Sequence, residues 1–86
     1  MATLDLANID VGNEYLKIPI DGSFEYGGLG DYATVEDNQF CIYINSFPIN
    51  DNEALKDFND FLGEVFSNGA IACSRISYEC SKFDFY

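Results

Sequence analysis

The sequence predicts a single α+β domain over residues 1–86, in which an antiparallel sheet of four to six strands carries one amphipathic helix, about residues 51–67, on one face. Three observations lead to this fold class. Hydrophobic residues make up 48% of the chain, which is enough to build a core. Several segments alternate apolar and polar residues as half-buried strands do, and one segment has apolar residues at helical spacing. A chain of 86 residues leaves no room for a second domain.

The first part of the chain predicts three strand segments. Residues 3–11 alternate and then shift phase, which indicates a strand with a bulge or a strand followed by a loop. Residues 16–20 alternate regularly, and a three-residue loop at 21–23 is expected to pair them with a strand over 24–26. Pro19 cannot donate to a sheet, so it indicates an edge strand or a position with its amide side outward.

A second hairpin is expected over residues 32–43, with a two-residue turn at 37–38. In this register the apolar residues of the two strands lie opposite each other on one face, and the first and last residues, which are both tyrosines, meet on the other face. The turn places Glu36 and Asp37 at an exposed tip.

The helix has recognisable start and stop signals. Asn50 is expected to cap it, Glu53 follows three residues later as in a capping box, and Ile49 is placed as a hydrophobic staple. Gly69 is expected to end the helix in a left-handed conformation. The apolar stripe that the sheet must cover consists of Ala54, Leu55, Phe58, Phe61, Leu62, Val65 and Phe66.

The segment after the helix, residues 70–86, alternates again with two changes of phase. We therefore expect one long bent strand or two short ones. Aromatic residues continue to the end at Phe83, Phe85 and Tyr86, which predicts that the C-terminus is held in the sheet.

The charge balance restricts the partners. Fifteen acidic residues against four basic ones give a net charge of −11, so the chain lacks the clustered cations that direct nucleic-acid binding requires. An anionic membrane would repel it as well. A field of one sign favours fast association with an opposite charge, which indicates a basic macromolecule as partner. Solubility alone is the alternative explanation of the acidity.

Four carboxylates succeed one another on the polar side of the predicted helix: Glu53, Asp57, Asp60 and Glu64. At 100° per residue they fall within an arc of roughly 60°, and neighbours along the row are about 4.5 to 6 Å apart in axial rise. Phosphates of one DNA strand succeed one another at about 3.4 Å, so the row approximates a stretch of nucleic-acid backbone. Repulsion between like charges at i, i+4 opposes helix stability, which favours a functional explanation over a merely solvated face. Together with Glu36 and Asp37, the row is the predicted partner-binding surface.

These features predict a small acidic inhibitor that mimics nucleic-acid charge and blocks a DNA- or RNA-binding protein, in the manner of phage anti-CRISPR or anti-restriction proteins. One alternative is an immunity protein or antitoxin that neutralises a basic nuclease toxin. A second alternative is an acidic soluble domain with a structural or adaptor role. The tyrosines Tyr15, Tyr32 and Tyr43 are candidate interface residues in the first two cases. A homodimer is possible.

No catalytic, metal or cofactor site is expected. The chain contains no histidine, and its serines therefore lack the usual base partner. Cys41, Cys73 and Cys80 form no C-x-x-C pair and are interpreted as free core residues. The glycine-rich segment 27–31 lacks the spacing and the lysine of a phosphate-binding loop. The N-terminus shows no signal-peptide pattern, so a cytoplasmic location is expected, in the host cytoplasm if the chain is phage-encoded.

Overall fold

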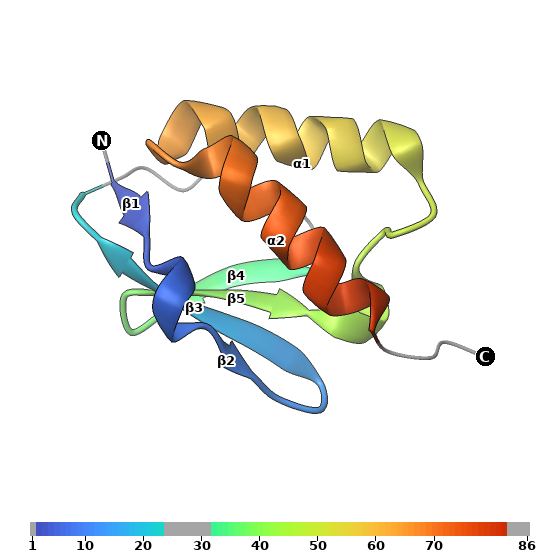
Figure 1. Ribbon diagram of the computed structural model, residues 1–86, viewed down its shortest axis with the longest axis horizontal. Helices are drawn as coiled ribbons and strands as arrows, with labels where there is room; N and C mark the ends of the chain where they lie inside the picture. The colour runs from blue at the N-terminus through green and yellow to red at the C-terminus, as the bar shows by residue number, and fades with distance from the viewer. Residues whose placement is uncertain (1, 24–31, 83–86) are drawn as a thin grey trace.

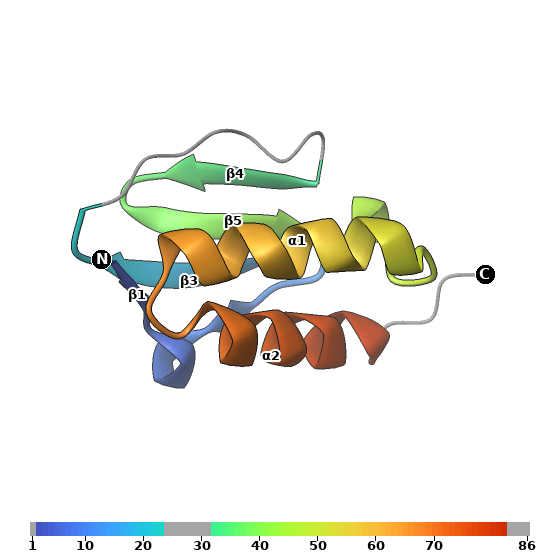
Figure 2. The same ribbon diagram turned by 90° about the horizontal axis from the view of Figure 1, so that it is seen from above.

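The computed structural model of the chain describes residues 2–23 and 32–82 (Figure 1). Within these residues, five strands form one antiparallel sheet, and two helices lie side by side over one face of it (Figures 1 and 2). The α+β class and the expected number of strands are confirmed. One helix is the amphipathic helix of the sequence analysis, and the second occupies a segment whose alternation predicts strand.

The sheet has the strand order β1-β3-β5-β4, and β2 pairs with β3 on the same side as β1. The elements are β1 (Thr3–Leu4), 3₁₀-helix η1 (Leu6–Asn8), β2 (Asp10–Val11), β3 (Tyr15–Asp21), β4 (Ala33–Glu36), β5 (Gln39–Tyr43), 3₁₀-helix η2 (Ile44–Ser46), α1 (Asn52–Val65) and α2 (Gly69–Ser81). The phase shift that the sequence shows within residues 3–11 corresponds to η1, which separates β1 from β2.

β3 lies in the centre of the sheet, so the expectation that Pro19 marks an edge strand is wrong. Proline is tolerated there because no strand residue pairs with it on the side of β1 and β2, where its carbonyl accepts a hydrogen bond from the Asp5 amide, 2.9 Å away. The nitrogen of Pro19 points to the same side of β3 and so faces the interruption between β1 and β2. The predicted strand over 24–26 lies outside the described residues, and the described partners of β3 are β1, β2 and β5.

The β4–β5 hairpin has the predicted register and turn. Val35 lies opposite Phe40, and the turn residues Asp37 and Asn38 have φ angles of 50° and 61°, as a two-residue hairpin turn of right-handed twist requires. The amide of Asn38 donates to the carbonyl of Ile20 at 2.6 Å and so ties the turn to β3.

The two tyrosines of this hairpin do not meet. Tyr32 packs against Phe47 and Phe58 in the core, whereas Tyr43 makes an edge-to-face contact with Tyr15 on the opposite face of the sheet. Ring centroids in the aromatic core are 5.4 to 6.3 Å apart, and the cluster joins Tyr32, Phe40, Phe47, Phe58 and Phe66. This cluster lies between the sheet and α1, which explains why α1 needs its wide apolar stripe.

α1 begins one residue later than expected. Its N-cap is Asp51, whose carboxylate accepts from the amide of Ala54 at 3.1 Å, so the assignment of Asn50 as the cap is wrong. Both residue types are good caps, and the sequence pattern alone does not separate neighbouring candidates. Gly69 does not end α1 either. The helix ends at Val65, and Gly69 is the first residue of α2.

α2 replaces the strand predicted from residue 70 onward, up to Ser81. Its buried residues follow a helical spacing: Gly69, Ala72, Cys73, Ile76, Glu79 and Cys80. Two residues that supported alternation, Ile71 and Tyr78, are 67% and 59% exposed. The change of phase at residues 74–75 therefore reflects helical spacing, because the buried residues Cys73 and Ile76 are three positions apart on one face of the helix. The predicted placement of Phe83, Phe85 and Tyr86 lies outside the described residues.

A side-chain clamp joins β1 to the connection between α1 and α2. The side-chain amide of Asn68 accepts from the Leu4 backbone N–H at 3.1 Å and donates to the Leu4 carbonyl at 2.8 Å, as a neighbouring strand would.

Asn68→Ala is expected to lower the free energy of unfolding by about 1 to 3 kcal/mol, because it leaves two part-buried backbone groups of Leu4 without partners. Urea unfolding measures this loss. The control Asn59→Ala removes an exposed amide of α1 and is expected to change stability by less than about 0.5 kcal/mol.

Candidate functional site

The candidate site is the α1 carboxylate row, which consists of Glu53, Asp57, Asp60 and Glu64. All four residues are exposed, and the helix buries Phe58 and Leu62 on its other side. Sheet packing fixes the direction of the row, because Phe58 stacks against Phe40 of β5 in the core. The structure thus brings the four predicted helix residues together on one solvent-facing strip.

The row has no compensating ion pair among residues 2–23 and 32–82. Residues 51–65 contain five carboxylates, including the cap Asp51, against the single cation Lys56, so this segment carries a net charge of −4. Asp51 is not among the site residues predicted from the sequence. The sequence does contain a signal for Asp51, because it directly precedes the helix and aspartate is a good N-cap residue.

Two of the four cationic side chains form ion pairs with a carboxylate outside the row. Arg75 Nε and Lys82 Nζ each lie 3.3 Å from Glu79 Oε1, and Glu79 is buried in α2. A third cation, Lys17, lies over the ring of Tyr15 at 4.9 Å on the far face of the sheet. Because Arg75, Lys82 and Lys17 are engaged in these contacts, none of them neutralises the row.

The hairpin tip is a separate acidic feature. Glu36 and Asp37 are exposed, as expected, at the turn between β4 and β5. This turn lies at the end of the sheet layer, one layer below α1 (Figures 1 and 2). The tip and the α1 carboxylate row therefore do not form one continuous strip.

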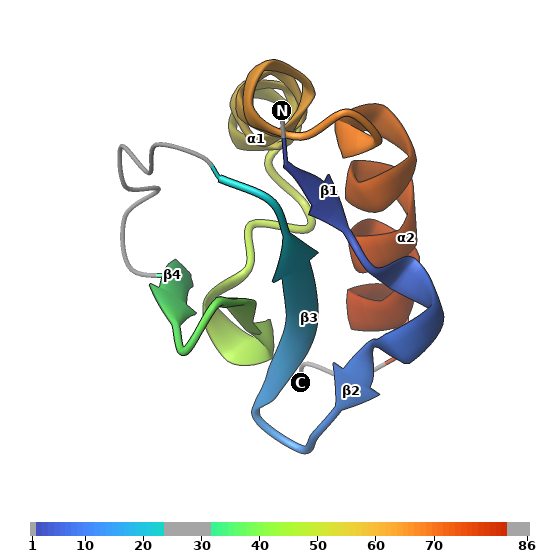
Figure 3. The same cartoon turned by 90° about the vertical axis from the view of Figure 1, so that its left-hand side faces the viewer.

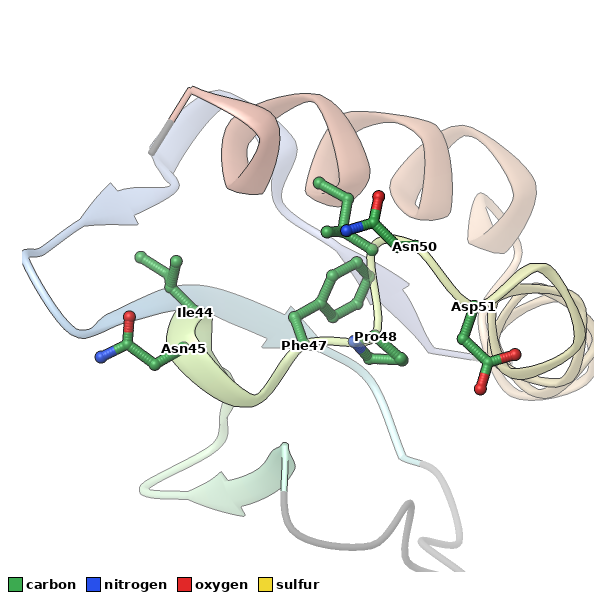
Figure 4. A pocket seen from close by; sticks show the side chains of 7 residues that line it. Ile44, Asn45, Phe47, Pro48, Asn50 and Asp51 are labelled. Carbon is green, nitrogen blue, oxygen red and sulfur yellow. The ribbon is translucent and has the colours of Figure 1, made fainter. Parts of the chain in front are cut away.

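A pocket of about 390 Å³ adjoins the N-terminal end of α1 (Figure 4). It combines apolar side chains with two amides and the cap carboxylate, and its lining consists of Ile44, Asn45, Phe47, Pro48, Ile49, Asn50 and Asp51. Asp51 belongs to both the pocket and the acidic segment. An apolar recess at the N-terminal end of an acidic helix is a suitable place for an anchoring side chain of a partner protein. No motif in the sequence indicates this pocket.

The three cysteines are free, buried thiols, with Cys41 in β5 and both Cys73 and Cys80 in α2. Burial raises the pKa of the Cys80 thiol to about 12, and the adjacent Glu79 adds to this effect. Burial also raises the pKa values of Cys41 and Cys73. Thiols of this kind are poor nucleophiles and poor ligands at neutral pH. Among residues 2–23 and 32–82, no group of three or more acidic, cysteine or histidine side chains is arranged to hold a metal ion.

The raised pKa of Cys80 predicts a loss of stability at alkaline pH. The folded thiol keeps its proton until about pH 12, whereas the unfolded thiol loses it near pH 9, so the folded state binds more protons between these values. The free energy of unfolding is therefore expected to fall as the pH rises through this window. Urea unfolding at several alkaline pH values measures the slope. Cys80→Ala should show a shallower slope, and equal slopes in the two proteins would contradict the prediction.

No protein-family model matches the chain, and neither a curated protein nor a solved structure matches it. In the described part of the chain, neither helix has the length and apolar character needed to span a bilayer. The functional conclusion therefore depends on the chemistry of the site itself.

Proposed function

We propose that this chain is a stoichiometric inhibitor that presents the α1 carboxylate row to the nucleic-acid-binding cleft of a basic protein. The observation that carries this proposal is an exposed row of four carboxylates with no ion-pair partner in the described residues, on a helix whose orientation is fixed by the core. The phage anti-defence type of inhibitor is the form that we favour.

The dimensions of the row support the proposal. Residues 53 to 64 advance through 11 residue steps, which is about 16 Å along a helix, or roughly five phosphate steps of one DNA strand. A cleft lined with Lys and Arg to bind such a stretch would meet several carboxylates at once. Each contact would form a charge-assisted hydrogen bond, and the field of the whole chain would accelerate the encounter.

The pocket at the N-terminal end of α1 supports a protein partner rather than a small cation as the bound species. Protein interfaces place apolar anchor residues in recesses next to polar contacts. The pocket meets the acidic segment at the cap residue Asp51, so a partner that reaches the N-terminal end of α1 would contact both. An immunity protein that neutralises a nuclease toxin would use the same surface. The two functions differ in what they compete with: a nucleic-acid mimic is displaced by nucleic acid, whereas an immunity protein binds its one toxin.

The test is affinity capture of the tagged chain from nuclease-treated lysate of its native host, with washes at low salt and at about 0.5 M salt and with excess duplex DNA as competitor. The expected result is a nucleic-acid-processing protein that is released by salt and displaced by DNA. The matched control is the variant carrying Asp57→Lys and Asp60→Lys, which should capture much less of the same protein.

Other outcomes would reject the proposal. Capture of one small toxin that DNA does not displace would establish the immunity function instead. Capture of nothing, or equal capture by the row variant, would show that the acidic row has no such partner and would leave a structural or adaptor role.

A further inference from the structure

The α1–α2 connection, residues 66–68, lies beside β1 (Figures 1 and 3). Ala2 forms a parallel bridge with Phe66, and the backbone N–H of Ser67 donates to the Ala2 carbonyl at 2.8 Å. Asn68 comes next, is half-buried, and holds Leu4 with its side-chain clamp. A few polar contacts with β1 therefore hold the segment that joins the two helices.

Asn68 is followed by Gly69, and this pair of residues is chemically reactive. A main-chain nitrogen can attack the side-chain amide carbon of the asparagine before it. A glycine nitrogen does so most readily, because no Cβ atom obstructs its approach. The chain contains eight asparagines, and Asn68 is the only one that a glycine follows. The sequence therefore carries one favoured site for the loss of a side-chain amide.

The folded chain holds this pair in an unreactive geometry. Attack closes a succinimide ring, in which the Gly69 nitrogen must lie on the same side of the Asn68 Cα–C bond as the Asn68 Cβ atom. The ψ angle of Asn68 is 29°, which turns the Gly69 nitrogen nearly to the opposite side. The nitrogen and the amide carbon therefore cannot approach to the roughly 3 to 3.5 Å at which they would react.

Three hydrogen bonds maintain this geometry. Two of them are the clamp bonds, which hold the Asn68 amide against the backbone of Leu4. In the third, the N–H of Gly69 donates to the Phe66 carbonyl at 3.1 Å, so the attacking nitrogen is itself engaged. The ψ angle of Asn68 can rotate only when these bonds break, which requires the α1–α2 connection to detach from β1.

We propose that Asn68 is a self-modification site that reacts when the α1–α2 connection opens. The Gly69 nitrogen bonds to the Asn68 Cγ atom and gives its proton to the departing amide nitrogen, which leaves as ammonia. Water then opens the succinimide at either carbonyl, so position 68 becomes aspartate or isoaspartate. The balance requires only water, because an amide and water are converted to a carboxyl group and ammonia.

The product cannot rebuild the clamp. A carboxylate has no N–H group to donate to the Leu4 carbonyl, and it would place a charged oxygen beside that carbonyl. Isoaspartate also adds a methylene to the main chain next to Gly69, where even a Cβ atom would overlap the carbonyl group of Leu62. Reaction of the opened connection is therefore irreversible and loosens both helices from β1. This inference concerns the fold and is independent of the proposed function.

The test follows every asparagine during incubation of the full chain in mildly alkaline buffer, with and without a denaturing concentration of urea. Peptide mapping by mass spectrometry gives the rate at which each amide becomes a carboxyl group. In urea, Asn68 is expected to react faster than the other seven asparagines, which serve as internal controls. In the folded chain, Asn68 should react at least about 10-fold more slowly than in urea, because the reaction requires local opening.

A substitution in β1 tests whether opening of the connection controls the rate. The Thr3 Oγ1 and Ser67 Oγ atoms lie 2.7 Å apart in a hydrogen bond between β1 and the connection. Thr3→Val removes this bond and should raise the rate at Asn68 about 3-fold or more in the folded chain, with no change in urea. Thr34→Val makes the same change in β4, at the other end of the strand order, and should alter neither rate.

Asn68→Asp reproduces the aspartate product and tests its consequence. It is expected to speed amide hydrogen exchange of Ser67 at least about 10-fold, because the clamp beside that N–H group loses a bond. Asn59→Asp makes the same change of charge at an exposed position of α1 and should leave exchange at Ser67 unchanged.

Three results would overturn the proposal. Conversion of Asn68 in urea no faster than that of the other asparagines would contradict the chemistry. Equal rates at Asn68 in the folded and the urea-unfolded chain would contradict protection by the clamp. Exchange at Ser67 that is unaffected by Asn68→Asp would contradict the structural consequence.

Discussion

Reversal of two charges in the α1 carboxylate row, Asp57→Lys together with Asp60→Lys, is expected to weaken binding of the captured partner by about 100-fold or more. The reason is that two favourable contacts with a basic cleft become two repulsive ones. The fold should survive, because both residues are exposed and each new lysine lies one turn from a glutamate of the row, Glu53 or Glu64. Titration calorimetry measures the affinity, and circular dichroism measures the fold.

The matched control places the same change of charge elsewhere. Asp10→Lys with Glu14→Lys alters β2 and the loop after it, which lie on the far side of the molecule from α1 (Figure 1). This control should reduce the association rate modestly and leave the dissociation rate unchanged. If it weakens binding as much as the α1 variant does, the partner senses the overall field, and the row is not the contact.

Gly69→Ala is expected to lower the free energy of unfolding by about 2 to 3 kcal/mol. A Cβ atom at this position would overlap the backbone carbonyl group of Leu62 and lie 2.6 Å from the nitrogen of Gly63. These are main-chain atoms of α1 and cannot rotate away, so α1 and α2 would have to separate where the chain turns between them. The gain in helix propensity from glycine to alanine is at most about 1 kcal/mol, because Gly69 is the first residue of α2, and it offsets only part of the loss.

Gly63→Ala provides the internal control, because a Cβ atom at Gly63 meets no atom within 4 Å. This exposed substitution in α1 should stabilise the protein by about 0.5 to 1 kcal/mol through helix propensity alone. Thermal and urea unfolding of the two variants should therefore move in opposite directions. A Gly69→Ala protein as stable as the wild type would show that the close contact between α1 and α2 is not required.

Local sequence patterns are sufficient to predict an element where only one periodicity and one turn type fit the segment. The β4–β5 hairpin is predictable because Asp37 and Asn38 tolerate positive φ angles and the flanking residues alternate strictly. The exposed acidic strip of α1 is predictable because six apolar positions between Asn52 and Val65 define the inner side of the helix and leave the carboxylates outside.

The same patterns fail where two periods fit equally well. In α2, isoleucine, tyrosine and cysteine recur at both strand and helix spacings, and its serines and cysteines have no strong helix propensity. Burial of Ala72, Cys73, Ile76 and Cys80 against the neighbouring layer decides for the helix. Likewise, the central place of β3 depends on pairing with strands distant in sequence, which an alternating segment does not specify.

The α+β class, the charge of −11 and the amphipathic stripe of α1 follow from the chain alone, because composition and short-range periodicity need no knowledge of distant contacts. Packing in three dimensions makes α2 a helix, places β3 in the centre of the sheet, and holds three of the four cations away from the α1 carboxylate row. Those features depend on which distant side chains share a buried surface, and the free energy of that burial outweighs weak local preferences.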